Sequence, residues 1–386
     1  MIESNLFHPD VLRELRQLPN LFETISTFKG KELGLQKLLR AEFDDYLVRA
    51  ALLITDLRKR GAVKFSRADQ MWFDRVGLEQ STSEQVANYK APRFHGDVID
   101  ICSGIGGDSI AMARHANVTS IDRVEARGLC LQWNAKAYGV DLNVETREAS
   151  PDTAAGKLVH IDPDRRAGAR GRSLRIDDLE PGPDFLNSLM QKARGGAIKL
   201  SPASNFRGHF DDCEVELISF GGECKEATVW FGDLKSEHSA RATVVETGET
   251  ISGDLSYDMA EVSAPLRYVF DPDPALVRSG LLDQFALQHG LFRLDAEEEY
   301  LTADELPDSQ FARGRFEVLA NLSNDAKSLR KYVRENNVGR IEIKSRRVAV
   351  DVEKLRRSLK LKGQEFATAV IARLDGAARI LVGRRV

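Results

Sequence analysis

The stretch that decides the fold is residues 97–113, DVIDICSGIGGDSIAMA. Its apolar part, Val98 to Ile101, predicts a buried strand, and a helix is expected from Asp108. Three glycines between them predict a tight loop: Gly104, Gly106 and Gly107. A strand that turns through glycines into a helix lets backbone N–H groups come close to a ligand. The stretch therefore indicates a parallel α/β fold with a nucleotide-like ligand at the loop, although a connection without a ligand has the same pattern.

An acidic residue at the end of the next strand narrows the kind of ligand. Residues 117–121 (NVTSI) predict a short strand that ends at Asp122. A carboxylate there would accept hydrogen bonds from two ribose hydroxyls. Ser109 stands where the dinucleotide fingerprint GxGxxG has its third glycine, which argues against a pyrophosphate. S-adenosylmethionine, which carries an adenosine and a charged amino acid but no phosphate, fits this pattern.

The first two motifs of the class I S-adenosylmethionine-dependent methyltransferases resemble a set of residues in these two strands and the loop: Asp100, Gly104, Gly106, Gly107 and Asp122. The form CSGIGGDSIAMA is especially similar to the trimethylguanosine synthase branch. The resemblance implies a Rossmann-like sheet of seven strands. It also implies that Glu148, after the third strand, lies near the adenine, although an ordinary loop carboxylate has the same sequence signal. The cofactor-binding residues expected on this basis are Asp100, Cys102, Gly104, Gly106, Gly107, Asp122 and Glu148.

Length and composition are those of an ordinary globular protein. The chain has 386 residues, of which 42% are hydrophobic and 30% charged, enough for two or three domains. Its four cysteines are scattered without metal-ligand spacing, so we expect reduced thiols, a cytoplasmic location and no metal site. The first residues are acidic and interrupted by Pro9, which does not indicate a signal peptide. No apolar run approaches the roughly 20 residues of a membrane span.

The pattern of apolar residues divides the chain into three parts. Residues 1–95 predict an N-terminal helical region, in which Trp72 and Phe73 either pack in its core or line the rim of the cofactor site. Residues 96–262 predict the methyltransferase domain, with an exposed hairpin within the polar segment 233–262. The expected strands of this domain are residues 97–102, 117–121, 142–146, 158–161, 196–200, 214–220 and 226–231.

Residues 263–386 predict a smaller α/β domain with a basic end. Residues 321–386 contain 17 Lys and Arg against 7 Asp and Glu, a net charge of +10 in a chain whose total is −4. Such a concentration favours a phosphate-binding surface, although a solvated helix face is also compatible with it. The order helix, strand, helix, strand, strand over this block resembles the THUMP-like domain behind the catalytic domain of some bacterial methyltransferases. That resemblance implies RNA as a partner.

The candidate for catalysis follows the fourth predicted strand in residues 158–166, LVHIDPDRR. Asp162 and Pro163 end this strand at the edge where open α/β sheets bind ligands, although Asp-Pro also marks simple turns. The pair resembles the D/N/S-P-P-aromatic motif of amino methyltransferases, with Asp164 and Arg165 in place of the second proline and the aromatic residue. The resemblance implies that Asp162 and the carbonyl near Pro163 hold an amino group for methylation.

Residues after these strands are candidates for contact with the substrate. Four arginines either grip phosphates or belong to an exposed loop: Arg165, Arg166, Arg170 and Arg172. Lys199 either lines the pocket or pairs with an acidic neighbour. The substrate-binding residues expected are Asp164, Arg165, Arg166, Lys199 and Ser201.

The sequence thus predicts an RNA methyltransferase that acts on a base amino group and uses S-adenosylmethionine. Two alternatives stay open: a methyltransferase with a small-molecule or protein substrate, and a non-catalytic RNA-binding protein that retains the cofactor.

Overall fold

The computed structural model of the protein describes residues 6–165, 175–255 and 258–386. By their internal contacts these residues form two compact units. The first unit consists of Met1–Cys213 with Thr228–Lys235, and the second of Glu214–Ala227 with Ser236–Val386.

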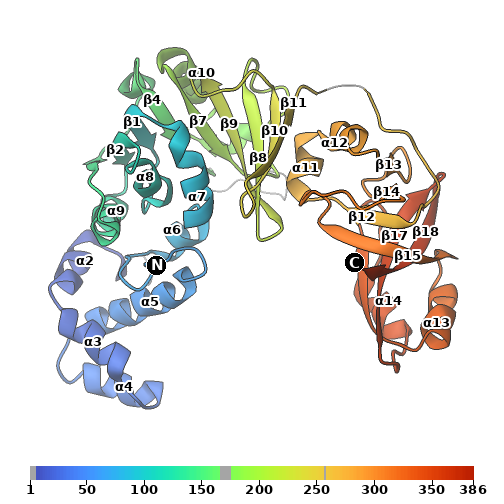
Figure 1. Cartoon of the computed structure of the whole chain (residues 1–386). Coiled ribbons are helices and arrows are strands. Elements are labelled where there is room, and N and C mark those ends of the chain that lie inside the picture. The colour runs from blue at the N-terminus through green and yellow to red at the C-terminus, as the bar shows by residue number, and fades with distance from the viewer. Residues whose placement is uncertain (1–5, 166–174, 256–257) are drawn as a thin grey trace. The chain divides into compact units, whose positions relative to one another are not determined.

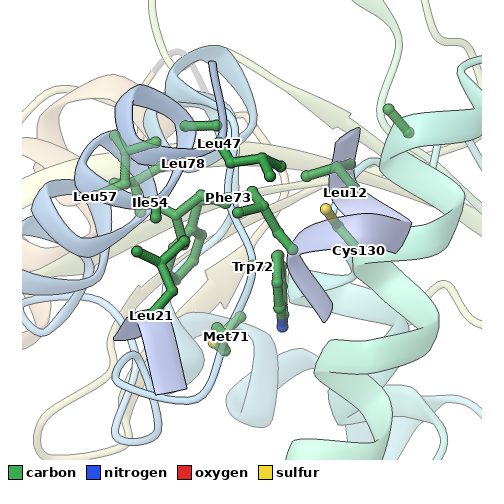
Figure 2. Packing of buried hydrophobic residues seen from close by; sticks show 14 of the residues in the cluster. Leu12, Leu21, Leu47, Ile54, Leu57, Met71, Trp72, Phe73, Leu78 and Cys130 are labelled. Atoms are coloured by element: carbon green, nitrogen blue, oxygen red, sulfur yellow. The ribbon is translucent and has the colours of Figure 1, made fainter. Parts of the chain in front are cut away.

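The first unit begins with helices whose apolar faces share one core. Figure 1 shows the first four of them gathered together. The helices before the sheet are α2 (Pro9–Arg16), α3 (Pro19–Thr27), α4 (Glu32–Leu39), α5 (Asp45–Gly61), α6 (Arg75–Gln80) and α7 (Glu84–Lys90). Figure 2 shows Trp72 and Phe73 in this core, close to Met71 and Leu21. Both aromatic residues are almost fully buried, which confirms the core interpretation of this pair.

A parallel sheet with its helices forms most of the rest of the first unit, and Asp164–Arg165 and Leu179–Glu180 form a separate antiparallel pair. Neighbouring strands of the parallel sheet pair in parallel, because each connection crosses over the sheet before the chain returns. The strands and helices are β1 (Gly96–Ile101), α8 (Gly107–Met112), β2 (Ala116–Asp122), α9 (Glu125–Tyr138), β3 (Asn143–Thr146), β4 (Leu158–Ile161), β5 (Asp164–Arg165), β6 (Leu179–Glu180), α10 (Pro183–Lys192) and β7 (Gly195–Leu200). The strands predicted from the sequence in this stretch are all present to within one residue at each end.

The large sheet has nine strands where the sequence predicted seven. Its order is β11-β10-β8-β9-β7-β4-β1-β2-β3. The further strands are β8 (Glu214–Phe220), β9 (Glu223–Gly232), β10 (Ala240–Val244) and β11 (Glu249–Gly253). The hairpin expected in residues 233–262 is present as β10 and β11, but it is not exposed, because β10 pairs with β8 and most of its side chains are buried. A polar side chain of β10 finds its hydrogen-bond partner within the fold, because the Thr243 hydroxyl donates to Glu216 at 2.6 Å.

The second unit also contains a separate sheet of seven strands in the order β13-β14-β12-β15-β18-β17-β16. Its elements are β12 (Tyr268–Asp271), α11 (Pro274–Ser279), α12 (Leu282–Gln288), β13 (Phe292–Arg293), β14 (Leu301–Ala303), β15 (Gly314–Ser323), α13 (Ala326–Glu335), β16 (Val338–Ser345), α14 (Val352–Ser358), β17 (Glu365–Leu374) and β18 (Ala377–Arg385). The last five match the predicted order helix, strand, helix, strand, strand. The sequence analysis missed β12 to β15.

None of the helices in the described part of the chain is long and apolar enough to cross a membrane.

Candidate active site

The glycine loop between β1 and α8 has a conformation that requires glycine. Gly106 has a φ of 94°, and a Cβ there would lie 2.9 Å from Cγ of Leu131. A Cβ on Gly107 would lie 2.9 Å from the backbone oxygen of Thr82. Gly104 also has a positive φ, but no atom beyond its chain neighbours lies within 4 Å of the Cβ position. The loop is therefore packed tightly on its inner side and open at Gly104, as a ligand-binding loop requires.

Asp122, predicted to bind ribose hydroxyls, ends β2 and holds the glycine loop in place. Its Oδ2 accepts a hydrogen bond from the backbone N of Gly104 at 2.9 Å, and its Oδ1 accepts one from Val124 at 2.8 Å. A carboxylate offers about four acceptor positions, so both oxygens can accept further hydroxyl groups.

A cavity of about 410 Å³, which we call the larger cavity, lies beside Asp122. Its apolar walls include Ile121, Phe185 of α10 and Phe7 from the N-terminal segment. Glu148 lines it as well, at the position that the sequence analysis assigned to adenine recognition. This volume is typical of sites for small organic ligands.

A second cavity of about 40 Å³, which we call the smaller cavity, adjoins the larger one. The two adjoin because Cys102, Arg127 and Asp164 line both. The smaller cavity is also lined by Gln80, Ser81, Thr82, Asp100, Ser103, Gly104, Asp108, His160 and Asp162. Burial raises the pKa of the Cys102 thiol, so this side chain stays protonated.

Strand register explains why these side chains meet. Partners on adjacent strands form a row across the sheet: Ser120, Asp100, His160 and Ala197. The residues two positions further along the four strands stand at or just beyond the carboxyl ends of the strands: Asp122, Cys102, Asp162 and Lys199. The first three of them line the cavities. The structure thus places the candidate catalytic residue beside the candidate cofactor-binding residues.

Asp162 is paired with Lys199. The Nζ of Lys199 lies 2.6 Å from Oδ2 of Asp162 and donates to the backbone oxygen of Gln80 at 3.3 Å. Burial raises the pKa of Asp162 above its ordinary value, although the Lys199 ammonium opposes this shift. Pro163, which follows, is buried. Of the two interpretations of Lys199, the structure shows the pairing with an acidic neighbour.

Of the other candidate substrate-binding residues, some line the cavities and others do not. Asp164 lines both cavities, and its Oδ2 lies 3.7 Å from Nη1 of Arg127. Arg165 pairs through its backbone with Leu179 in the two-stranded sheet of β5 and β6. Ser201 lines neither cavity, and its hydroxyl accepts a hydrogen bond from the backbone N of Ala203. The predicted residues Arg166, Arg170 and Arg172 lie outside the described residues.

A buried charged cluster beneath the smaller cavity was not anticipated from the sequence. Asp100 accepts from Ser109 Oγ and lies 2.7 Å from Nδ1 of His160, while Asp108 lies 2.8 Å from Nζ of Lys90. Burial alone would lower the pKa of His160, but the carboxylates Asp100 and Asp108 hold it above its ordinary value. Burial alone would raise the pKa of Asp108, but Lys90 and His160 hold it below. The signal in the sequence was a histidine within an otherwise apolar strand.

Asn134 of α9 is a second residue that the sequence analysis missed. Its Nδ2 donates to the backbone oxygens of Trp72 and Ile105 at 3.1 and 3.0 Å, and its Oδ1 accepts from Trp72 N at 2.7 Å. Asn134 is fully buried. It therefore ties the glycine loop, through Ile105, to the core of the N-terminal helices. One asparagine in a helix carries no sequence signal for such a link.

In the second unit, a cavity of about 1000 Å³ lies between α13 and the segment after α14. We call it the basic groove. Six of its lining residues are cationic: Lys327, Arg330, Lys331, Arg334, Lys360 and Lys362. The positive charge of the sequence is thus concentrated at a concave surface, an arrangement that favours the binding of anions. Among the described residues, no His, Cys, Asp or Glu side chains form a group that could hold a metal ion.

Comparisons with protein families match two parts of the chain. A family model described as RNA cap guanine-N2 methyltransferase matches residues 95–160, which contain the glycine loop and most of β4. A model described as THUMP domain-like matches residues 314–385, which contain the basic groove.

Individual proteins match nearly the whole chain. An uncharacterized S-adenosylmethionine-dependent methyltransferase of Mycobacterium tuberculosis is 33% identical over 357 residues, which are 88% of this chain and 96% of the relative. A crystal structure described as a methyltransferase from Porphyromonas gingivalis W83 has a TM-score of 0.79. It is 19% identical and the match covers 96% of this chain and 98% of that one, a likeness that shows the fold alone.

Proposed function

The chain belongs to the S-adenosylmethionine-dependent methyltransferases, and we propose that it methylates an amino group of an RNA base. The observation that carries the proposal is the position of Asp162 and Pro163. They follow β4 at the carboxyl edge of the sheet, and Asp162 lines the smaller cavity, which adjoins the larger one. Open α/β sheets bind their ligands at this edge.

S-adenosylmethionine fits the residues around the two cavities. Gly104 leaves open space in the loop, and the larger cavity has room for an adenosine. We propose that Asp122 accepts the ribose hydroxyls and that Glu148 lies at the adenine. When bound, the cofactor supplies a methyl group on a positively charged sulfonium. We propose that Asp100 of β1 and the loop residues Cys102, Gly106 and Gly107 complete the cofactor site.

Asp162 and Pro163 have the chemistry to hold an amino nucleophile. The lone pair of an exocyclic base amino group is delocalised into the ring, so the group attacks poorly unless it is positioned. An ionised Asp162 accepts one N–H and the backbone carbonyl of Pro163 accepts the other. The nitrogen is thereby held in line with the methyl group, and this alignment is the main contribution that a protein makes to a displacement.

RNA is the acceptor that the second unit supports. The basic groove presents six cations, and residues 314–385 match a THUMP domain-like model. The guanine-N2 description of the match at residues 95–160 points to the same chemistry. We propose that residues 96–262 are the catalytic domain, that residues 263–386 bind RNA, and that residues 1–95 support the cofactor loop.

Transfer of labelled methyl groups tests the proposed function. We expect the full-length protein to transfer the label from S-adenosylmethionine into RNA extracted from cells that lack it. Digestion and mass spectrometry of the nucleosides should place the methyl group on an exocyclic nitrogen. A label found only in proteins or small molecules would support the first alternative. Asp164 and Arg165 depart from the D/N/S-P-P-aromatic motif, and this departure is the observation in favour of the non-catalytic alternative. That alternative predicts no transfer of label at all.

Removing charge from the basic groove should weaken RNA binding in a salt-dependent way. We expect the double variant Lys331→Ala with Arg334→Ala to lose about tenfold in RNA affinity. The slope of log affinity against log salt should fall by about 1.4–1.8, since each phosphate contact contributes about 0.7–0.9. The matched control removes two exposed lysines of the N-terminal region, Lys29→Ala with Lys37→Ala, and should keep the wild-type slope. Equal slopes for all three proteins would contradict the assignment of the groove.

A further inference from the structure

Lys199 and Asp162 form an ion pair between two neighbouring strands at the carboxyl edge of the sheet. Strand register pairs Ile161 of β4 with Ile198 of β7, so the residues that follow them stand side by side. The Nζ of Lys199 lies 2.6 Å from Oδ2 of Asp162 and donates to the backbone oxygen of Gln80 at 3.3 Å. Gln80 is the last residue of α6, and both it and Asp162 line the smaller cavity. One ammonium group thus joins two residues of the cavity wall.

The two members of the pair differ in what they can reach. The Asp162 side chain is 33% exposed and lines the smaller cavity, whereas the Lys199 side chain is 11% exposed and lines neither the smaller nor the larger cavity. A molecule in the smaller cavity therefore meets the carboxylate and not the ammonium. Lys199 engages Oδ2, and no hydrogen bond among the described residues reaches Oδ1. The pair therefore fixes the carboxyl group by one oxygen and leaves the other as an acceptor.

The charges around Asp162 show why a cation is needed beside it. Three other aspartates line the smaller cavity, so Asp162 stands among groups of its own charge. Burial raises the pKa of Asp162, and the Lys199 ammonium is the main influence in the opposite direction. The ionisable groups near the carboxyl group come from every element around it: Lys90 on α7, Asp100 on β1, Cys102 after β1, Asp108 on α8, Arg127 on α9, His160 on β4, Asp164 on β5 and Lys199 on β7.

We infer that Lys199 is a positioning residue for the proposed methyl transfer: it holds Asp162 by Oδ2 and keeps it ionised, so that Oδ1 accepts an N–H of the amino group. The inference rests on the proposed function, because it deepens the role of Asp162 in that reaction. A protonated carboxyl group is a weaker acceptor than a carboxylate and carries a donor of its own. Lys199 acts through Asp162, so its effect has to appear in the ionisation of that residue. An ion pair that serves only the fold has no such effect.

The pH dependence of single-turnover methyl transfer to RNA tests this role. Lys199→Met removes the charge and nearly keeps the length of the side chain. We expect the acidic limb to move up by about 1–3 pH units, since a neighbouring opposite charge shifts the pKa of a carboxyl group by that amount. Below both limbs the variant should be slower by about tenfold for each unit of this shift. The loss should shrink as the pH rises, because Asp162 then ionises without help.

Three further variants keep the test decisive. Lys199→Arg retains the positive charge and should keep the acidic limb close to that of the wild type. Lys199→Gln removes the charge but keeps a hydrogen-bond donor, and it should show the upward shift if Lys199→Met does not fold. The matched control is Lys192→Met, which breaks an exposed ion pair with Asp152 and should leave rate and profile unchanged. A loss by the same factor at every pH would show that the Lys199 pair serves only the fold, and it overturns the inference.

A measurement without turnover separates failure of this inference from failure of the proposed function. In protein with isotope-labelled aspartate carboxyl carbons, the NMR signal that is missing from Asp162→Asn belongs to Asp162. Its titration should move to higher pH in Lys199→Met. Lack of methyl transfer by the wild type would contradict the proposed function. An unmoved titration would overturn the role of Lys199 even in a protein that transfers methyl groups.

Discussion

Replacing Asp162 with asparagine should lower kcat for methyl transfer by about 10²–10³-fold while S-adenosylhomocysteine binds within about threefold of wild type. Asparagine has nearly the same shape and keeps one acceptor oxygen. It lacks the negative charge that strengthens the hydrogen bond from the nucleophile's N–H and balances the positive charge developing on the nitrogen. Preorganised electrostatic contacts of this kind are worth about 3–4 kcal/mol of activation free energy. Single-turnover transfer to RNA, with a separate calorimetric titration, measures the two effects.

The pH dependence gives a second readout of the same residue. Burial raises the pKa of Asp162, so its carboxylate is lost on acidification at a pH above the usual range for aspartate. Activity of the wild type should therefore fall on the acidic side, and this limb should be absent from the variant. The matched control is Asp141→Asn at an exposed carboxylate of the same unit, which should leave rate and profile unchanged. A variant of Asp162 with near-normal kcat would remove the carboxylate from the mechanism.

The parts of the site that are local in sequence could be predicted from it. The glycine loop and Asp122 follow from a strand, a turn and a second strand, whose order alone fixes their position at the sheet edge. Asp162 could be placed for the same reason. Glu148 was assigned by resemblance, and the structure places it on the wall of the larger cavity. Its contact with adenine stays a prediction.

The parts of the site that depend on partners distant in the sequence could not be predicted from it. The polar strand β10 suggested exposure, because nothing in the sequence shows that the Thr243 hydroxyl meets Glu216, 27 residues earlier. His160 likewise looked like one polar residue in a buried strand until register placed it beside Asp100. Arg127 lies on α9, but its proximity to Asp164 requires the sheet to be assembled. Pairings across the sheet, not local patterns, decide these positions.

Replacing Asn134 with alanine should destabilise the first unit by about 3 kcal/mol and weaken cofactor binding. The substitution removes three buried hydrogen bonds and leaves the backbone groups of Trp72 and Ile105 without partners. For a unit of this size the loss corresponds to a fall in Tm of about 6–12 °C. Tryptophan fluorescence reports it well, since Trp72 and Trp133 lie in ring contact beside the substituted residue.

The effect on the cofactor separates a local link from general destabilisation. Ile105 lies in the glycine loop, so the loop should loosen even at temperatures where the variant is fully folded, and S-adenosylhomocysteine affinity should fall about tenfold there. Asn117→Ala, at an exposed asparagine of β2, should change stability by less than about 0.5 kcal/mol and leave affinity unchanged. If Asn134→Ala lowered Tm but kept full affinity, the N-terminal core would support the fold without holding the cofactor loop, because a loop held by Asn134 cannot lose this contact and keep its geometry.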